Sequence, residues 1–373
     1  MKRSGKIEYE VLRRSNRSLE KEIFAAVRRV IESGWYILGQ EVEKFEQQFA
    51  AYLGLKNCVG VANGLDALIL AIEALQLPRG SEILVAANTY IATIIAIIRS
   101  GHIPILVEPH KETFNINPKC IPGLVSNKTR AICVTHLFGK PCQMDEITKL
   151  SLEYDLKLIE DCAQSHGAKF KGQHTGTFGE IGCFSFYPTK NLGGLGDGGA
   201  IVTNNDSLAE YIRYVRNYGS KVKYHNKYVG CNSRLDEIQA AILSVKLARF
   251  ESLLDHKRTL ASAYSKKLPG WISTPFHDPD CVDAFHIYAV RHNKRNALRE
   301  WLMKHDVKTE IHYPIPPYRQ DALIGYFSGT YPISDELHET ELSLPISYGT
   351  TLEEVNHISS VINEIDLNQF DVG

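Results

Sequence analysis

Lys190 lies in a stretch of sequence whose composition could make a lysine side chain chemically reactive. The stretch reads FSFYPTKNLGGLGDGGA, from residue 184 to residue 200, and five of the seven residues from 193 to 199 are glycine. Glycine has no side chain, so the backbone of such a loop can approach a ligand closely. A lysine held there away from solvent has a lowered pKa, and its neutral amine is a nucleophile. The loop taken alone also fits a solvated surface lysine.

The same loop contains the spacing of a dinucleotide-binding fingerprint. Gly194, Gly196 and Gly199 match the pattern G-x-G-x-x-G. That fingerprint must follow a strand and open a helix, because the N-terminus of the helix binds the pyrophosphate. Here the letters AIVTNN follow, and they indicate a strand and a turn. We therefore interpret the match as a coincidence and reject a nicotinamide-binding turn.

Three other positions could serve the same ligand as the lysine. Asp161 follows the apolar run LKLIE, and ligands of open α/β sheets bind beyond the carboxyl ends of strands. Asn63 and Gly64 follow the run NCVGVA and open an amphipathic helix, whose N-terminus is a natural phosphate site. Tyr90 follows the run EILVA and could present an aromatic face to a ring. The alternatives are ordinary helix caps for Asp161 and Asn63 and a core side chain for Tyr90.

Together these positions match the needs of one cofactor. Pyridoxal phosphate requires a phosphate cradle, a stacking partner, an aspartate for its pyridinium nitrogen and a lysine for its aldehyde. Gly64, Tyr90, Asp161 and Lys190 supply these parts in that chain order. The constellation therefore predicts a pyridoxal phosphate enzyme.

The elements that must position these residues are indicated by alternating patterns. Short apolar runs alternate with helical periodicity, which predicts an α/β fold with a mostly parallel sheet between helices. The last two runs leave no room for a crossover helix, so that pair is predicted to be antiparallel or irregular. The expected strands are 57–62, 82–86, 103–107, 131–135, 156–160, 182–187 and 200–203.

A change of domain is expected near residue 250. Residues 232–268 are strongly helical, and residues 271–373 mix short strands with helices. We predict a large cofactor-binding domain over 1–250 and a smaller C-terminal α+β domain over 251–373.

Composition excludes several classes of protein. The chain has 373 residues, a formal net charge of −1 and no run of basic residues long enough to favour nucleic acid. The most apolar run, IATIIAII, is far shorter than the roughly 20 residues of a membrane span. The eight cysteines form no C-x-x-C pair, so we expect no metal site and a reducing, cytoplasmic location.

Eight ordered segments, which together span nearly the whole chain, carry a resemblance to a known family. The chain resembles the nucleotide-sugar aminotransferases, the DegT/StrS group of fold-type-I pyridoxal phosphate enzymes. The segments are SGWYILGQEVEKFE (33–46), VANGLDAL (61–68), ANTYIAT (87–93), HLFGKPCQMDEI (136–147), EDCAQSHGA (160–168), FSFYPTKNLGGLGDGGAIVT (184–203), GCNSRLDEIQAAIL (230–243) and HYPIP (312–316).

The resemblance implies roles for the residues around the cofactor ring. Lys190 would bond to the cofactor and, once released, move protons between cofactor and substrate. Asp161 would pair with the pyridinium nitrogen, and Gln164 would contact the phenolic oxygen. Tyr90 would stack on the ring. Some members have histidine in place of the lysine and remove a sugar hydroxyl, and Lys190 argues against that branch.

The resemblance also implies how the phosphate is held. The backbone of Gly64 and Leu65 and the hydroxyl of Ser185 would bind it. Asn232 would reach the phosphate from a neighbouring subunit, which implies a homodimer with shared active sites.

The reaction implied by the family is transamination between L-glutamate and a keto-sugar on a nucleotide diphosphate. The segment IHYPIPPYRQ (311–320) resembles enzymes that aminate carbon 3 of the sugar. We therefore expect a 3-keto-6-deoxyhexose on dTDP, aminated to a dTDP-3-amino-3,6-dideoxyhexose for surface-polysaccharide (including lipopolysaccharide) or glycoside biosynthesis. The alternatives are a UDP-linked 3-keto sugar, a 4-keto-6-deoxyhexose, and a non-catalytic regulatory relative of the same fold.

Substrate contacts are expected at His166, His312 and Tyr313. His166 lies in the cofactor motif QSHGA, and the other two lie in HYPIP. All three could instead be packing residues. The letters PPYRQ (316–320) depart from the usual PLHLQ of the family, which leaves the contacts of that loop open.

Overall fold

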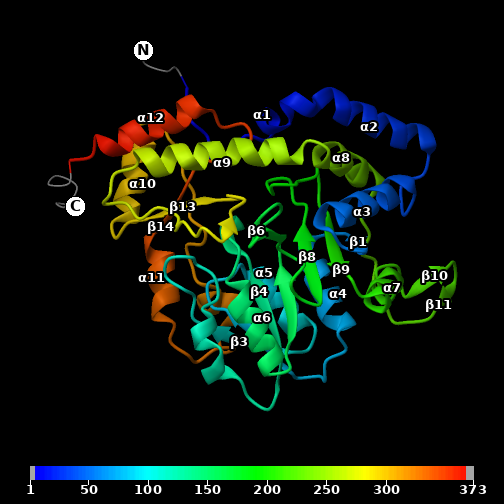
Figure 1. The fold of residues 1–373 in the computed structure, drawn as a ribbon. Helices are drawn as coiled ribbons and strands as arrows, with labels where there is room; N and C mark the ends of the chain where they lie inside the picture. Colours follow the sequence, from blue (N-terminus) through cyan, green and yellow to red (C-terminus); the bar gives the residue numbers. More distant parts are fainter. Residues whose placement is uncertain (1–4, 367–373) are drawn as a thin grey trace.

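A seven-stranded sheet forms the centre of the computed structural model, which describes residues 5–366 (Figure 1). Its strand order is β1-β9-β8-β5-β4-β2-β3. Every expected run is a strand, with ends that differ by at most two residues. The strands are β1 (Asn57–Val61), β2 (Glu82–Ala86), β3 (Ile103–Val107), β4 (Thr129–Thr135), β5 (Lys157–Asp161), β8 (Ile181–Ser185) and β9 (Gly199–Thr203).

The sheet is parallel except at β9, which runs antiparallel to both of its neighbours, β1 and β8. The predicted antiparallel pair of β8 and β9 is therefore confirmed. The physical reason is the short connection, because residues 186–198 form a loop instead of the crossover helix that a parallel pair needs. The loop keeps Lys190 at the end of the sheet where β5 and β8 also finish.

Helices cover both faces of the sheet (Figure 1). On one face α4, α5 and α7 pack against alternate strand residues, and on the other α3, α6 and α8 pack against the rest. The α/β class predicted from the sequence is confirmed. The helices are α1 (Leu12–Asn16), α2 (Glu20–Ser33), α3 (Gln40–Leu53), α4 (Gly64–Ala74), α5 (Ile91–Arg99), α6 (Met144–Glu153), α7 (Asp206–Val215), α8 (Glu237–Leu247), α9 (Phe250–Lys267), α10 (Arg295–Lys304), α11 (Pro332–Thr340) and α12 (Leu352–Asn363).

Smaller sheets lie outside the central one. Two short strands form a hairpin after α7, a three-stranded sheet joins residues near 170 to residues near 281, and another pair belongs to the C-terminal part. These strands are β6 (Lys169–Phe170), β7 (Gln173–His174), β10 (Ser220–Val222), β11 (His225–Asn226), β12 (Cys281–Val282), β13 (Tyr288–Arg291) and β14 (Glu341–Leu344).

A separate hydrophobic cluster, called here the C-terminal core, joins α9, α10, α12, β13 and β14. Its members include Leu260, Tyr288, Leu342 and Ile358. Ile7 also belongs to it, through a parallel β-bridge to Val307. Helix α9 spans both regions, because its first turns pack in the cluster that joins α3 and α8 to the large sheet, and its later turns pack in the C-terminal core (Figure 1). The domain boundary near residue 250 stays a prediction.

No helix within residues 5–366 is long and apolar enough to cross a membrane.

Strand β8 lies unusually close to the turn that precedes it. A Cβ atom added to Gly182 would stand 2.6 Å from the carbonyl oxygen of Gly176 and 2.7 Å from its Cα. Both neighbours are backbone atoms, which cannot move aside as a side chain can. Glycine at this position therefore allows the turn at 176–179 to rest directly on the sheet.

We expect the substitution Gly182→Ala to lower the free energy of unfolding by about 1–3 kcal/mol, because overpacking against rigid backbone strains both segments. Urea-induced unfolding followed by circular dichroism measures this loss. Gly123→Ala is the matched control, because a Cβ there meets no atom within 4 Å. Equal stability of the two variants would contradict the close contact.

Candidate active site

Asp161 is the last residue of β5, and its carboxylate is buried at the carboxyl end of the sheet. Its Oδ2 accepts a hydrogen bond from the Thr93 hydroxyl (2.7 Å), and its Oδ1 accepts one from the Ala163 N–H (3.0 Å). Burial raises the pKa of Asp161, although these bonds and the charge of Lys190 act in the opposite direction. A cationic group placed beside Asp161 would therefore be strongly favoured.

Lys190 follows β8 in a turn closed by a hydrogen bond from its N–H to the Tyr187 carbonyl (2.8 Å). Burial lowers the pKa of its amine to about 8, and the nearby charge of Asp161 raises it. With that pKa, roughly one amine in ten is neutral at pH 7. The structure thus provides the desolvated lysine that the glycine-rich loop suggested.

Gln164 links the cofactor motif to the segment around residue 313. Its Oε1 accepts a hydrogen bond from the Phe138 N–H (2.6 Å), and its Nε2 donates one to the Tyr313 hydroxyl (3.0 Å). The rings of Tyr313 and Tyr90 lie with their centroids 5.2 Å apart. Tyr90 is 46% exposed at the N-terminus of α5, so it is not the core side chain of the alternative interpretation.

The N-terminus of α4 meets β8 at Ser185. Asn63 caps this helix by accepting a hydrogen bond from the Asp66 N–H (2.8 Å). The N–H groups of Gly64 and Leu65 belong to the first helical turn, where backbone donors have no helical acceptor. A Cβ on Gly64 would lie only 2.6 Å from the Cβ of Ser185, so the lack of a side chain at residue 64 lets the N-terminus of α4 lie directly against Ser185.

His166 lies in the packed interior. Its ring is 1% exposed and lies between Phe184 and Phe186, with centroid distances of 5.3 and 5.8 Å. Burial, with a smaller effect from the charge of Lys190, lowers the pKa of His166 to about 3, so the ring is neutral. A substrate contact for His166 stays a prediction, and its burial favours a packing role.

His312 lies beside Tyr313 and is partly buried. Burial, helped by the charge of Lys190, lowers the pKa of His312 to about 4. The structure therefore brings His312, Tyr313, Gln164 and Lys190 to the same end of the sheet.

Asn232 is exposed and lies on the segment that follows the β10–β11 hairpin. Its neighbour Ser233 accepts a hydrogen bond from the Ala62 N–H (3.1 Å), so this segment runs beside the start of α4. Within residues 5–366 no hydrogen bond connects the Asn232 side chain to the other candidates. Its predicted role across a subunit interface stays a prediction.

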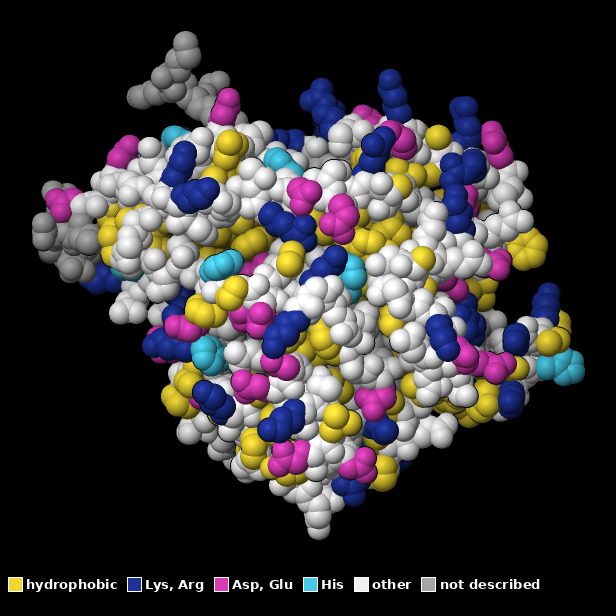
Figure 2. Space-filling model, viewed as in Figure 1, with side chains coloured by type: hydrophobic (Ala, Val, Ile, Leu, Met, Phe, Trp, Pro, Cys, Tyr) yellow, Lys and Arg dark blue, Asp and Glu magenta, His cyan; other side chains and the backbone are white. Residues whose placement is uncertain are grey.

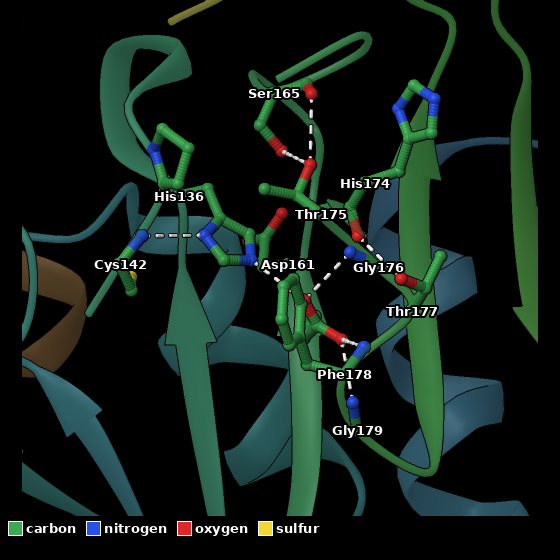
Figure 3. A network of polar contacts seen from close by, with 12 residues as sticks. His136, Cys142, Asp161, Ser165, His174, Thr175, Gly176, Thr177, Phe178 and Gly179 are labelled. Atoms are coloured by element: carbon green, nitrogen blue, oxygen red, sulfur yellow. Dashed lines mark hydrogen bonds and ion pairs between the residues drawn. The ribbon is translucent and has the colours of Figure 1, made fainter. Parts of the chain in front are cut away.

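A polar network on the opposite face of β5 was not anticipated from the sequence (Figure 3). It centres on Glu160, whose side chain points away from Asp161, as the alternation of a strand predicts. The Glu160 carboxylate is fully buried and accepts four hydrogen bonds. The donors are His136 Nε2 (3.0 Å) and the backbone N–H groups of Gly176 (2.7 Å), Phe178 (2.7 Å) and Gly179 (2.8 Å).

This network holds the segments that flank Asp161. The ring nitrogen Nδ1 of His136 accepts a hydrogen bond from the backbone N–H of Cys142 (3.0 Å). The backbone N–H of His136 donates a hydrogen bond to the backbone carbonyl of Asp161 (3.1 Å). The adjacent pair Glu160-Asp161 was the available sequence signal. Its partners at 136 and 176–179 lie too far along the chain for a local pattern to reveal them.

Three residues in or next to this network have the side-chain types and spacing of a possible metal site. Side-chain atoms of His136, Glu160 and Cys162 lie within 4.8 Å of one another, close enough to hold an ion. Both nitrogens of His136 are engaged, however, and each oxygen of Glu160 already accepts two hydrogen bonds. The protein itself satisfies these atoms, so their arrangement gives no reason to place a metal there.

The chain is similar to a known protein family and to individual proteins over most of its length. The model of the DegT/DnrJ/EryC1/StrS aminotransferase family matches residues 17–363. The chain is 47% identical to a protein of Aneurinibacillus thermoaerophilus named dTDP-3-amino-3,6-dideoxy-alpha-D-galactopyranose transaminase. That match covers 94% of this chain and 97% of the relative.

Solved structures agree with the fold. The structure of Streptomyces venezuelae DesV in complex with a ketimine intermediate has a TM-score of 0.95 and 37% identity, covering 97% of this chain and 100% of that one. The structure of Bacillus subtilis NtdA with bound cofactor PMP has a TM-score of 0.88 and 28% identity, covering 97% and 86%.

We expect Glu160→Gln to lower the free energy of unfolding by about 1–3 kcal/mol, because the amide NH₂ would face a backbone donor and leave it unsatisfied in the interior. Glu180→Gln is the control, since Glu180 accepts the Leu158 N–H near the same turn but is 34% exposed. Urea-induced unfolding of both variants measures the difference. A larger loss in the Glu180 variant would contradict the importance of the network.

Proposed function

The chain belongs to the DegT/DnrJ/EryC1/StrS aminotransferase family, and from that premise we propose that it aminates a 3-keto-6-deoxyhexose carried on dTDP. The amino donor is L-glutamate, and the product is a dTDP-3-amino-3,6-dideoxyhexose for surface-polysaccharide, such as lipopolysaccharide, or glycoside biosynthesis. The observation that carries the proposal is the 47% identity, over 94% of the chain, to a relative named as a transaminase of that class.

The family uses pyridoxal phosphate, and the described residues fit this cofactor. The close approach of Gly64 to Ser185 places the first N–H groups of α4 next to a serine hydroxyl, and such a set of donors at a helix N-terminus suits a phosphate. Asp161 suits the protonated ring nitrogen, because burial leaves its carboxylate in need of a positive partner. When bound, the cofactor supplies an electron sink that makes an amino acid's α-proton labile.

Each proposed contact has a distinct task. Leu65 joins Gly64 in offering backbone N–H groups to the phosphate, and Tyr90 offers a ring face. Gln164, fixed by Phe138 and Tyr313, would contact the phenolic oxygen of the cofactor ring.

Lys190 holds and moves the proton that transamination requires. A pKa lowered to about 8 brings its Nζ nearer to neutral pH than an ordinary lysine, so the neutral acceptor form is accessible beside the protonated donor form.

We also propose a homodimer that shares its active sites. Several large apolar side chains of the segment 33–46 are exposed, among them Trp35 (62%) and Tyr36 (49%), and such a patch is typical of an interface. In that dimer Asn232 contacts the phosphate bound by the partner subunit. The eight free cysteines accord with a cytoplasmic location.

A regulatory role through nucleic acid has less support. Acidic and basic side chains are interspersed over the face shown in Figure 2, without the single-sign field that nucleic-acid binding requires. The catalytic lysine of the proposed enzyme is also present.

Incubation with L-glutamate and each candidate nucleotide sugar tests the substrate. We expect mass spectrometry to detect an amino sugar from the dTDP-linked 3-keto-6-deoxyhexose at a kcat/KM at least about tenfold above those of the dTDP-linked 4-keto and UDP-linked 3-keto sugars. Preference for either rival would replace the proposed substrate. Absence of amination with every sugar and donor would favour the regulatory alternative.

We expect Lys190→Ala to reduce turnover at least about a thousandfold, because no other described amine stands beside Asp161 to transfer the proton. Coupled assay of 2-oxoglutarate release measures the loss. Lys149→Ala, on the exposed face of α6, is the control and should keep wild-type turnover. Near-normal turnover in the Lys190 variant would overturn the assignment.

A further inference from the structure

A buried carboxyl group is connected to His312 by one serine hydroxyl. His312 Nδ1 lies 2.8 Å from Ser343 Oγ. Ser343 Oγ in turn makes a short hydrogen bond to Glu341 Oε1. The other oxygen of Glu341 accepts a hydrogen bond from the backbone N–H of His312 (2.7 Å). The three side chains therefore form one continuous hydrogen-bonded chain that ends on an imidazole ring.

Strand β14 fixes the geometry of this chain. Glu341 and Ser343 are two residues apart on β14, so they project from the same face. The backbones of Ser343 and Glu310 pair with each other, which holds the segment leading to His312 alongside β14. Arg295 donates to the Glu341 carbonyl at 2.9 Å. The connection rests on regular backbone pairing and not on a mobile loop.

The His312 ring lies close to the candidate active site. The charge of Lys190 acts on this ring, and the next residue, Tyr313, holds Gln164. Within residues 5–366, no side chain or backbone group makes a hydrogen bond to His312 Nε2. This nitrogen is therefore the one that can reach a ligand.

The serine makes the chain reversible, because its hydroxyl carries a single hydrogen. When Glu341 is ionised, Ser343 donates to Glu341, His312 Nδ1–H donates to Ser343, and Nε2 is a bare acceptor. When Glu341 is protonated, Glu341 donates to Ser343, Ser343 donates to Nδ1, and Nε2 carries hydrogen. The charge state of Glu341 thus sets what His312 offers to the site.

The surroundings place the proton on the carboxyl group and not on the ring. Burial raises the pKa of Glu341 to about 8, whereas burial lowers the pKa of His312 to about 4. An imidazolium is therefore disfavoured, while both forms of Glu341 are accessible near pH 8. The other titratable and charged groups that face this cluster are Tyr9, Glu10, Lys190, His286, Arg295, Glu310 and Tyr313.

We propose that Glu341 and Ser343 are positioning residues that form a proton relay to His312, and that His312 Nε2 exchanges this proton with the carbonyl oxygen replaced by nitrogen during transamination. The inference rests on the proposed aminotransferase function. In the delivering direction, the Nε2–H bond breaks as an O–H bond forms on the departing oxygen, which leaves as water. The Ser343 hydrogen passes to Nδ1, and the Glu341 hydrogen passes to Ser343. His312 stays neutral throughout, and the negative charge comes to rest on Glu341.

The tautomer of His312 gives a test that needs no substrate. The holoenzyme is labelled with ¹⁵N-histidine, and its ring signals are recorded by NMR from pH 6.5 to 9.5, with His312→Gln identifying the relevant signal. We expect the proton of a neutral ring to move from Nε2 below about pH 8 to Nδ1 above it, following Glu341. A tautomer that stays fixed over this range, or an imidazolium in its place, would overturn the relay whichever sugar is the substrate.

Kinetics of the L-glutamate half-reaction, followed by the absorbance of the bound cofactor, give the second test. We expect Glu341→Gln and Ser343→Ala each to lower the rate constant about tenfold to a hundredfold and to remove the ionisation near pH 8 from its pH profile. The double variant should be no slower than either single one, because each breaks the same chain. Additive losses with the wild-type pH profile retained would reduce both residues to structural supports.

Two controls separate the relay from the loss of a buried polar group. Ser359→Ala removes a buried hydroxyl that donates to the Val355 carbonyl (2.9 Å), and Glu354→Gln neutralises a buried carboxylate at the start of α12. Both belong to the C-terminal part and should leave the pH profile unchanged. If these controls altered the profile as strongly as Glu341→Gln, the relay would be rejected.

Discussion

The burial of the Asp161 carboxylate at the end of β5 is the constraint on which the rest of the site depends. An ionised carboxylate withdrawn from water is costly unless hydrogen-bond donors and a cation offset the loss of hydration. Thr93 and Ala163 supply two hydrogen bonds, and Lys190 supplies a nearby charge that the same burial makes easy to neutralise. Asp161 can therefore exchange the positive charge of Lys190 for that of a bound ligand.

The reversal of the sheet at β9 is what keeps the lysine beside the aspartate. A crossover helix after β8 would have carried the chain away from the carboxyl end of the sheet, whereas the glycine-rich loop returns it within residues 186–198. On the other face of β5, the four hydrogen bonds to Glu160 lock the neighbouring turn.

Sequence patterns predicted the elements well and the contacts between distant segments poorly. The strands followed from apolar runs and the antiparallel pair from loop length, since both depend on neighbouring residues. Lys190, Asp161 and Gln164 were accessible because each lies in a short motif. Thr93 and Phe138, which complete the hydrogen bonds of Asp161 and Gln164, were not anticipated. Glu341 lies 29 residues from His312 along the chain, and no local pattern joins them.

The bridge between Ile7 and Val307 has a consequence for the order in which the protein is made. The C-terminal core takes one of its buried side chains from the first ten residues and the rest from residue 260 onward. During synthesis the start of the chain leaves the ribosome long before its partners exist. The central sheet, complete by residue 203, can form while the chain is still growing, but this core cannot close until residues as late as Ile362 and Ile365 have been made. The ring of His312 also depends on a contact of long sequence separation, because its centroid lies 5.8 Å from that of Tyr9.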